Sequence, residues 1–140
     1  VGVGREGRSD DRVGLDLAVG IKQAGRPEVY LEKEIEEDHV LERITGRPLI
    51  FLDAVNMGET PGKTALLPLQ HVFWNAVLSH RLLPAVTNRL TYEQVKNSYL
   101  LGIQPESVAE GGCLSDSVRK AAENIVEAIK KMTVQREKTD

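Results

Sequence analysis

The stretch LIFLDAV, residues 49–55, is the clearest strand in the sequence and decides the fold class. Its apolar residues follow one another without alternation, which is typical of a strand in a parallel sheet that is covered on both faces. Asp53 is the only charged residue in the stretch. An acid near the end of an apolar strand is costly unless it is solvated, hydrogen-bonded or paired with a cation, so Asp53 is a candidate functional residue.

Strand-like and helical patterns alternate on both sides of this stretch. Strands are expected at residues 1–4, 28–32, 64–69 (at a sheet edge) and 99–103, and helices from Val13 to a stop at 25–27, over 35–44, near Leu82, and onward from Ser115 as a cap. Such alternation predicts an α/β sandwich with a mostly parallel sheet, whose parallel neighbours are joined by right-handed crossovers.

The composition is that of one ordinary globular domain spanning residues 1–140. The net charge is −3, so the chain has no basic excess to neutralise the phosphates of nucleic acid or an anionic membrane. No apolar stretch approaches the ~18 residues of a membrane span. The single cysteine, Cys113, cannot form an internal disulfide, which fits a reducing compartment. A soluble, cytoplasmic protein is therefore expected.

The two ends of the sequence carry further expectations. The sequence begins at Val1 rather than Met, inside a strand pattern, so the first strand is expected to be truncated. The charged residues from about 134 onward are expected to be frayed.

Candidate site residues follow from the predicted sheet, because ligand sites in such sheets gather beyond the C-terminal ends of the strands. This rule selects Asp10 and Asp11 after the first strand, Asp53 in the strongest strand and Gln104 after the last one. A further side chain of metal-binding type, His80, comes later in the chain than Asp53. The carboxylates of Asp11 and Asp53 and this imidazole could hold a divalent transition metal and leave open positions for a substrate.

A purely structural interpretation of the same residues stays open at this point. Asp10 would cap a helix, Asp11 would be an acid in a first helical turn, and Asp53 would be a solvated loop acid. The spacing of Asp11, Asp53 and His80 matches no short metal-binding motif.

Three other patterns are weaker candidates. The glycines of GVGREG, residues 2–7, match the spacing of a dinucleotide-binding turn. Ser79 and His80 are adjacent, but a catalytic Ser–His pair is defined by geometry rather than by adjacency. Cys113 has no basic partner nearby in the sequence, so an unreactive thiol is expected.

Three separated segments match one known family in order and spacing. They are GVGREGRSDDRVG (residues 2–14), LDAVNMG (52–58) with a Pro-Gly pair at 61–62, and GIQPE (102–106). Together they resemble the hydrogenase maturation endopeptidases, in the group that processes the large subunits of energy-converting or formate-linked NiFe hydrogenases. His80 lies between the second and third segments, where these enzymes carry a histidine after Ser or Thr.

The resemblance implies a three-layer αβα sandwich around a short twisted sheet. It implies that Asp11, Asp53 and His80 are the catalytic and metal-binding residues, and that Gly102 and Gln104 line the substrate cleft, where Gln104 would donate a hydrogen bond to the substrate. The metal would be the nickel already installed in a hydrogenase large-subunit precursor, and no organic cofactor is expected. A monomer would use this nickel as a recognition signal and then cleave the C-terminal extension of the precursor.

Two residues depart from the family pattern. Arg5 stands where the family usually has Asn, and Arg12 stands where it usually has Gly. Asn and Gly at tight turns adopt backbone conformations that Arg adopts poorly, so an altered loop around Asp11 is expected. The alternative function is a non-catalytic module that binds a metal-bearing precursor or a nucleotide.

Overall fold

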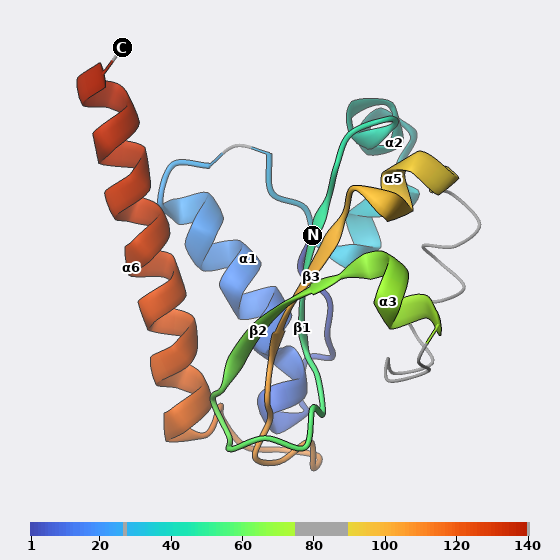
Figure 1. The fold of residues 1–140 in the computed structure, drawn as a ribbon. Coiled ribbons are helices and arrows are strands. Elements are labelled where there is room, and N and C mark those ends of the chain that lie inside the picture. Colours follow the sequence, from blue (N-terminus) through green and yellow to red (C-terminus); the bar gives the residue numbers. More distant parts are fainter. Residues whose placement is uncertain (27, 75–89, 140) are drawn as a thin grey trace.

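Three short strands form an open mixed sheet in the computed structural model, which describes residues 1–26, 28–74 and 90–139 (Figure 1). The strand order is β1 (Ile50–Ala54), β3 (Tyr99–Ile103), β2 (Thr64–Pro68). β1 and β3 are parallel, whereas β2 is antiparallel to β3 and lies at the edge. The three predicted strands are therefore confirmed to within one residue at either end.

The N-terminal segment extends this sheet on the other side of β1. Gly2 forms parallel bridges with Leu31 and with Leu52. Backbone hydrogen bonds of 2.8 to 2.9 Å join the segment to both neighbours. The segment around Leu31, the N-terminal segment, β1, β3 and β2 thus follow one another across the sheet, and only the last contact is antiparallel. The sheet is mostly parallel, as predicted.

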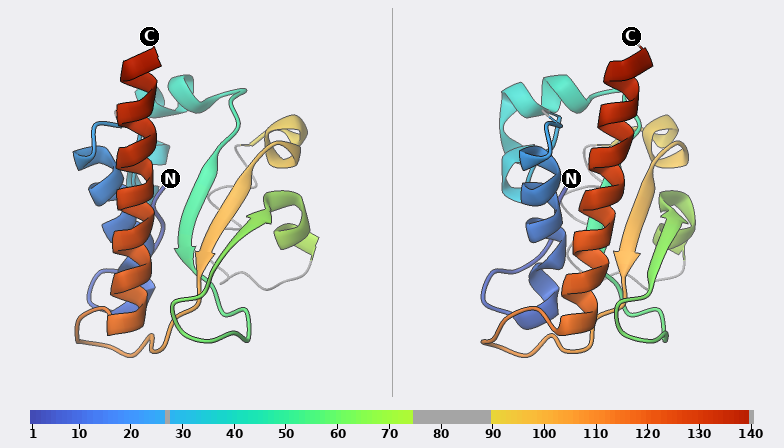
Figure 2. Two further views of the ribbon diagram at one scale, coloured as in Figure 1. Left: turned by 60° about the vertical axis from the view of Figure 1, so that its left-hand side comes forward. Right: turned by 90° about the vertical axis from the view of Figure 1, so that its left-hand side faces the viewer.

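Helices cover both faces of the sheet, so the chain forms the expected three-layer αβα sandwich (Figure 1 and Figure 2). On one face, α1 (Val13–Gln23) and α6 (Asp116–Thr139) lie side by side. The other face carries the 3-10 helix η2 (Glu32–Glu36) and the helices α2 (Asp38–Ile44), α3 (Leu69–Trp74) and α5 (Tyr92–Lys96).

Each face has its own apolar core. The core under α1 and α6 consists of Val13, Leu17, Ala18, Ile21, Leu52, Ile103, Val118 and Ala122. The core on the opposite face consists of Val3, Ile35, Val40, Ile44, Phe51, Val55, Leu69, Val72 and Leu100. Phe51 and Leu52 are neighbours in β1 and are buried in opposite cores, which explains why this strand is apolar without alternation.

Two local predictions were wrong. Residues 28–32 do not form a strand, because the chain bridges the sheet only at Leu31 and then enters η2. The single helix expected over 35–44 is interrupted at Glu37, whose backbone is extended (φ −78°, ψ 129°). The Glu34 carboxylate accepts from the Leu31 N–H over 2.6 Å, a capping contact that starts η2 where a strand was expected.

The last helix carries the predicted amphipathic face. Val118 and Ala122 of α6 are buried against the core that α1 also covers. α6 continues through the charged residues after Val134 to Thr139. In the part of the chain that the structure describes, no helix is long and apolar enough to cross a membrane. The helix expected near Leu82 lies outside the described residues.

The first turn of α1 rests directly on the backbone of the strands. A Cβ atom at Gly14 would overlap the carbonyl oxygens of Val3 and Leu52. Gly2 is packed just as closely against Gly14 and Ala18. This contact fixes the 3-10 helix η1 (Ser9–Arg12), which leads directly into α1, beside β1.

Gly14→Ala is expected to lower the free energy of unfolding by about 3 kcal/mol or more, because the added methyl group meets backbone that cannot yield without separating two strands. Val19→Ala is the matched control, since Val19 lies on the same helix and is 45% exposed, and it should change stability by less than about 1 kcal/mol. Urea unfolding followed by circular dichroism measures both. Wild-type stability of Gly14→Ala would contradict the close contact.

Candidate functional site

Asp53 lies in β1, one residue before the end of the strand, and is 2% exposed. Alternate residues of a strand point to the same side, so its side chain shares a sheet face with Phe51 and Val55. Its Oδ2 atom is buried and has no hydrogen-bond partner among the described residues. The interpretation of Asp53 as a solvated loop acid is therefore wrong.

The surroundings raise the pKa of Asp53 to about 8. Burial is the largest cause, because a poorly hydrated surrounding disfavours the charged carboxylate. The negative charge of Asp11 raises the pKa further, a hydrogen bond from the Ala54 backbone lowers it, and Glu32 raises it to a smaller extent. A buried acid with a pKa near neutrality is suited to binding a cation or to acid–base chemistry.

Asp11 lies in η1 and is partly buried. Its charge acts on the Asp53 carboxyl, so the fold brings these two predicted site residues to the same edge of the sheet. They come from different elements, since η1 precedes α1 while Asp53 belongs to β1. The rule that sites gather beyond strand ends thus selected two acids that do lie near each other.

The two arginines that depart from the family pattern fit the loop without strain. Arg12 has right-handed helical backbone angles (φ −88°, ψ −7°), so its position does not require glycine. Its guanidinium donates to Asp16 Oδ2 over 2.9 Å and to Asp16 Oδ1 over 3.1 Å. Arg5 has no left-handed backbone angle either, and its N–H donates to the Asp11 carbonyl over 3.1 Å. Neither arginine therefore occupies a backbone conformation that Arg adopts poorly, and an effect of the two arginines on the site stays a prediction.

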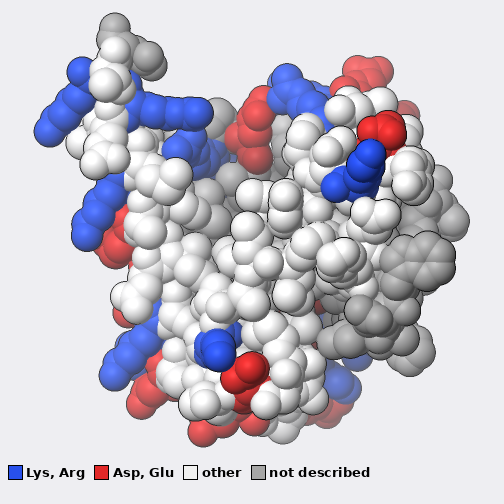
Figure 3. All heavy atoms as spheres, in the orientation of Figure 1, with Lys and Arg blue, Asp and Glu red and all other residues white. Residues whose placement is uncertain are grey.

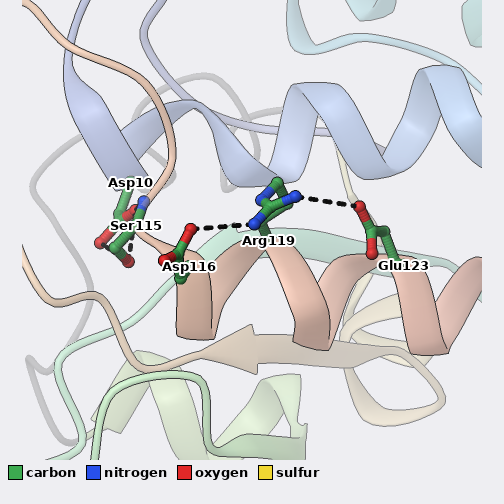
Figure 4. Close-up of polar contacts among 5 residues, drawn as sticks. All are labelled: Asp10, Ser115, Asp116, Arg119 and Glu123. Atoms are coloured by element: carbon green, nitrogen blue, oxygen red, sulfur yellow. Dashed lines mark hydrogen bonds and ion pairs between the residues drawn. The ribbon is translucent and has the colours of Figure 1, made fainter.

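Asp10 has a role that the sequence patterns do not indicate. It is fully buried, and its carboxylate accepts hydrogen bonds from Glu106, Ser107 and Ser115. Figure 4 shows the contact with Ser115. Burial raises the pKa of Asp10, but the hydrogen bonds from Ser115, Ser107 and Glu106 outweigh it and lower the pKa overall. The donors lie 96 to 105 residues away in sequence, so no local motif signals this arrangement.

Gly102 lies directly beside Asp53 in the parallel ladder between β1 and β3. A Cβ atom at Gly102 would come within 3.1 Å of a methyl carbon of Val55. Any larger residue would therefore crowd the face on which the Asp53 carboxyl lies. The expected place of Gly102 in the wall of a substrate cleft stays a prediction.

Gln104 is 7% exposed, and both ends of its amide are used within the protein. Its Oε1 accepts from the Met57 N–H over 2.6 Å and from the Glu59 N–H over 3.3 Å. Its Nε2 donates to Asn56 Oδ1 over 3.2 Å and to the Pro105 carbonyl over 3.3 Å. Gln104 thus holds the loop after β1, and a hydrogen bond from Gln104 to a substrate stays a prediction.

His80, the third predicted ligand, lies outside the described residues and stays a prediction. Among the residues that are described, no group of three His, Cys, Asp or Glu side chains could hold a metal ion. Cys113 is an exposed free thiol.

The GVGREG segment, residues 2–7, is used for packing rather than for a phosphate-binding turn. A Cβ atom at Gly4 would overlap the Asp11 carbonyl, so this glycine serves the close approach of the chain to itself. The carboxylates of Asp10 and Asp11 precede α1, where a dinucleotide-binding turn would present N–H groups to a phosphate. Two acids at this place disfavour a nucleotide.

A cavity of about 550 Å³ opens at the other end of the sheet. Figure 3 shows this hollow between the upper part of α6 and the rest of the molecule. Its lining includes Val1, Ile50 at the start of β1, and Met132 of α6. Asp53 lies near the opposite end of β1, so this cavity is separate from the candidate site.

Stability should depend on pH through Asp53. Its pKa rises from the ordinary value of 3.8 to about 8 on folding, so the folded protein binds the additional proton between these values. The free energy of unfolding should therefore fall as pH rises from about 5 to 8, by up to about 1.4 kcal/mol per pH unit, and level off above pH 8. Asp53→Asn should lose this slope, and Asp116→Asn, at an exposed position, should keep it. Urea unfolding between pH 5 and 9 measures the slopes, and parallel curves for wild type and Asp53→Asn would exclude a raised pKa.

Comparison with known proteins identifies the fold. No protein-family model matches the chain, and no curated protein matches it by sequence. Solved structures do match. The NiFe hydrogenase maturation protease HycI from Thermococcus kodakarensis KOD1 has a TM-score of 0.72 and 24% identity, over 93% of this chain and 87% of that one. The endopeptidase HycI from Escherichia coli has a TM-score of 0.71 and 21% identity (93% of this chain, 86% of that one), and the NiFe hydrogenase maturation protease HybD from Thermococcus kodakarensis has a TM-score of 0.68 and 19% identity (94% of this chain, 95% of that one). The chain therefore has the fold of the solved hydrogenase maturation proteases, as the resemblance of its three segments predicted.

Proposed function

We propose that this chain is a cytoplasmic endopeptidase that removes the C-terminal extension from the nickel-loaded large-subunit precursor of a NiFe hydrogenase. The observation that carries the proposal is the buried Oδ2 atom of Asp53, which has no hydrogen-bond partner among the described residues and lies within the electrostatic influence of Asp11. The shared fold with solved proteases of hydrogenase maturation supports the same assignment.

A cation at this edge of the sheet would offset the cost of the buried carboxyl. Carboxylate oxygens and an imidazole nitrogen are suitable ligands for a divalent transition metal such as nickel. Because the nickel arrives already bound to the precursor, the peptidase needs to supply only part of the coordination shell. Asp11, Asp53 and His80 are the residues that we assign to this role, with Gly102 leaving room beside Asp53.

The reaction is the hydrolysis of one peptide bond. Water adds across the bond, so the large subunit keeps a new carboxylate and the extension leaves with a new amino group. Docking of the nickel on Asp11 and Asp53 would fix the scissile bond relative to both carboxyls, which lowers the barrier by positioning. Without a metal ion Asp53 has a pKa of about 8. Nickel bound beside it would favour the ionised carboxylate, the form that holds a cation or accepts a proton.

The second candidate is a module that binds the same nickel-bearing precursor without cleaving it. It would need the same fold and the same acids, so only turnover separates it from the peptidase. The nucleotide-binding version of this alternative is disfavoured by the acids that precede α1.

Incubation of the purified protein with a nickel-loaded large-subunit precursor is expected to release the C-terminal extension, and a nickel-free precursor is expected to stay intact. Mass spectrometry of the large subunit measures both. Asp53→Asn should reduce cleavage by about 100-fold or more, since it removes a group that acts on the reacting centre, whereas the exposed acid variant Asp116→Asn should be fully active. Binding of the nickel-loaded precursor without cleavage would instead establish the binding module, and cleavage of both precursors would exclude nickel as the signal.

His80→Ala is expected to weaken the binding of free Ni²⁺ by about 10-fold or more, because loss of one ligand from a three-ligand site removes a metal–nitrogen bond. Isothermal titration calorimetry with NiCl₂ measures the affinity. His39→Ala is the matched control, since the His39 side chain is 71% exposed and lies 3.4 Å from the Glu37 carboxylate at the surface. Equal affinities of wild type and His80→Ala would remove His80 from the site.

A further inference from the structure

We infer that Asp10 is a positioning residue for the site: its buried carboxylate ties the turn that carries Asp11 to the loop before α6 and thereby holds Asp11 beside Asp53. The inference deepens the proposed function, because it names a residue that acts on the reaction through Asp11. The anchoring itself is a property of the fold and can be tested without the reaction.

The Asp10 carboxylate accepts hydrogen bonds from three residues of that loop, Glu106, Ser107 and Ser115, the last of which is drawn in Figure 4. Oδ2 accepts from the Glu106 N–H over 2.8 Å and from the Ser107 N–H over 3.1 Å. Oδ1 accepts from the Ser115 N–H over 2.7 Å, and the Ser115 hydroxyl lies 3.0 Å from Oδ1 and 2.8 Å from Oδ2. Four donors thus converge on one side chain that is fully buried.

Backbone contacts fasten the same two segments along their length. The Asp10 N–H donates to the Ser107 carbonyl over 3.0 Å, and the Gly111 N–H donates to the Gly7 carbonyl over 2.8 Å. The Ser9 hydroxyl donates to the Gly111 carbonyl over 3.2 Å. Ser9 has a positive φ of 26°, which is unusual for a residue other than glycine. The turn therefore adopts a shape that these contacts hold in place.

A carboxylate is required at position 10 because all four partners are donors. An ionised carboxylate has only acceptor sites, whereas the amide of Asn would direct an NH₂ group at one or more N–H donors. Buried donors that lose their acceptor keep the full cost of desolvation, so the loop would move to find water. Asp10→Asn is consequently a change in charge and hydrogen bonding at nearly constant shape.

The hydrogen bonds of Asp10 restrain Asp11 because Asp10 and Asp11 are neighbours in the four-residue helix η1. The Asp11 N–H donates to the Arg8 carbonyl over 2.9 Å, and the Asp11 carbonyl accepts from the Arg5 N–H over 3.1 Å. Asp11 is therefore held within the turn, and the turn is held against the loop by Asp10. Release of Asp10 would shift the Asp11 carboxylate relative to Asp53, and a displacement of about 1 Å at a reacting centre can cost about 100-fold in rate.

Asp10 and Asp116 offer a contrast between two acids that lie close together at the start of α6 (Figure 4). The Asp116 side chain is 86% exposed and pairs with Arg119 over 2.9 Å, and Arg119 also reaches Glu123 over 3.9 Å. Exposed pairs of this kind contribute little to stability. Asp116→Asn is thus a matched control for the loss of a negative charge at this end of the molecule.

The test compares Asp10→Asn, Ser115→Ala, Ser115→Thr and Asp116→Asn with the wild type. Hydrogen–deuterium exchange should show faster exchange in residues 5–12 and 105–115 for Asp10→Asn and Ser115→Ala, with α1 and the middle of α6 unchanged. Ser115→Thr keeps the hydroxyl and should restore protection, and Asp116→Asn should match the wild type. Cleavage of the nickel-loaded precursor should show kcat reduced by about 10-fold to 100-fold with KM unchanged for the first two variants.

Unchanged exchange in both Asp10→Asn and Ser115→Ala would overturn the anchoring. Faster exchange with unchanged kcat would overturn the positioning role and leave Asp10 as a purely structural residue. If Asp10→Asn does not fold, Ser115→Ala decides, because it removes one donor and leaves the carboxylate and its three N–H partners. If the wild type cleaves no precursor, the proposed function has failed, and the exchange of residues 5–12 alone then supports or overturns the anchoring.

Discussion

The close contact between the first turn of α1 and the strand backbone is the constraint on which the rest of the structure depends. Gly14 lies against the carbonyl oxygens of Val3 and Leu52, and no other residue type fits there. The helix therefore approaches the sheet closely, and the turn that leads into it starts beside β1. This contact brings η1 and its Asp11 to the same edge of the sheet as Asp53, and the Asp10 carboxylate then fixes the turn.

Two buried acids lie near this contact, and they differ in how their charge is balanced. Asp10 accepts four hydrogen bonds, which keep its pKa below the ordinary value despite burial. Asp53 has a buried oxygen without a partner among the described residues, and its pKa rises to about 8. The oxygens of Asp10 accept hydrogen bonds that hold two segments of the fold together. Asp53 keeps acceptor capacity available for a cation or a proton, at a cost in stability that is typical of functional sites.

The elements that could be predicted from the sequence are those whose pattern is set by burial alone. β1 is apolar on both faces because Phe51 and Leu52 are buried in different cores. The apolar residues of α6 recur at the helical period because one side of the helix packs on the sheet. The acids Asp11 and Asp53 were found because their places follow from sheet topology. The strand expected over residues 28–32 was wrong because a side-chain hydrogen bond to Glu34 starts a 3-10 helix at Glu32, and burial patterns do not register it.

The roles of Asp10 and Gln104 could not be predicted, because each depends on partners about 50 to 100 residues away. A sequence pattern identifies an acid or an amide but not whether backbone donors from another segment will saturate it. This distinction separates the two aspartates of the DD pair. Asp10 is enclosed by N–H donors and therefore cannot offer its oxygens to a metal, while its neighbour Asp11 is only partly buried and its charge acts on Asp53. One residue of the pair stabilises the turn so that the other has a defined position, and the shared motif is better understood as an anchor next to a ligand than as two equivalent acids.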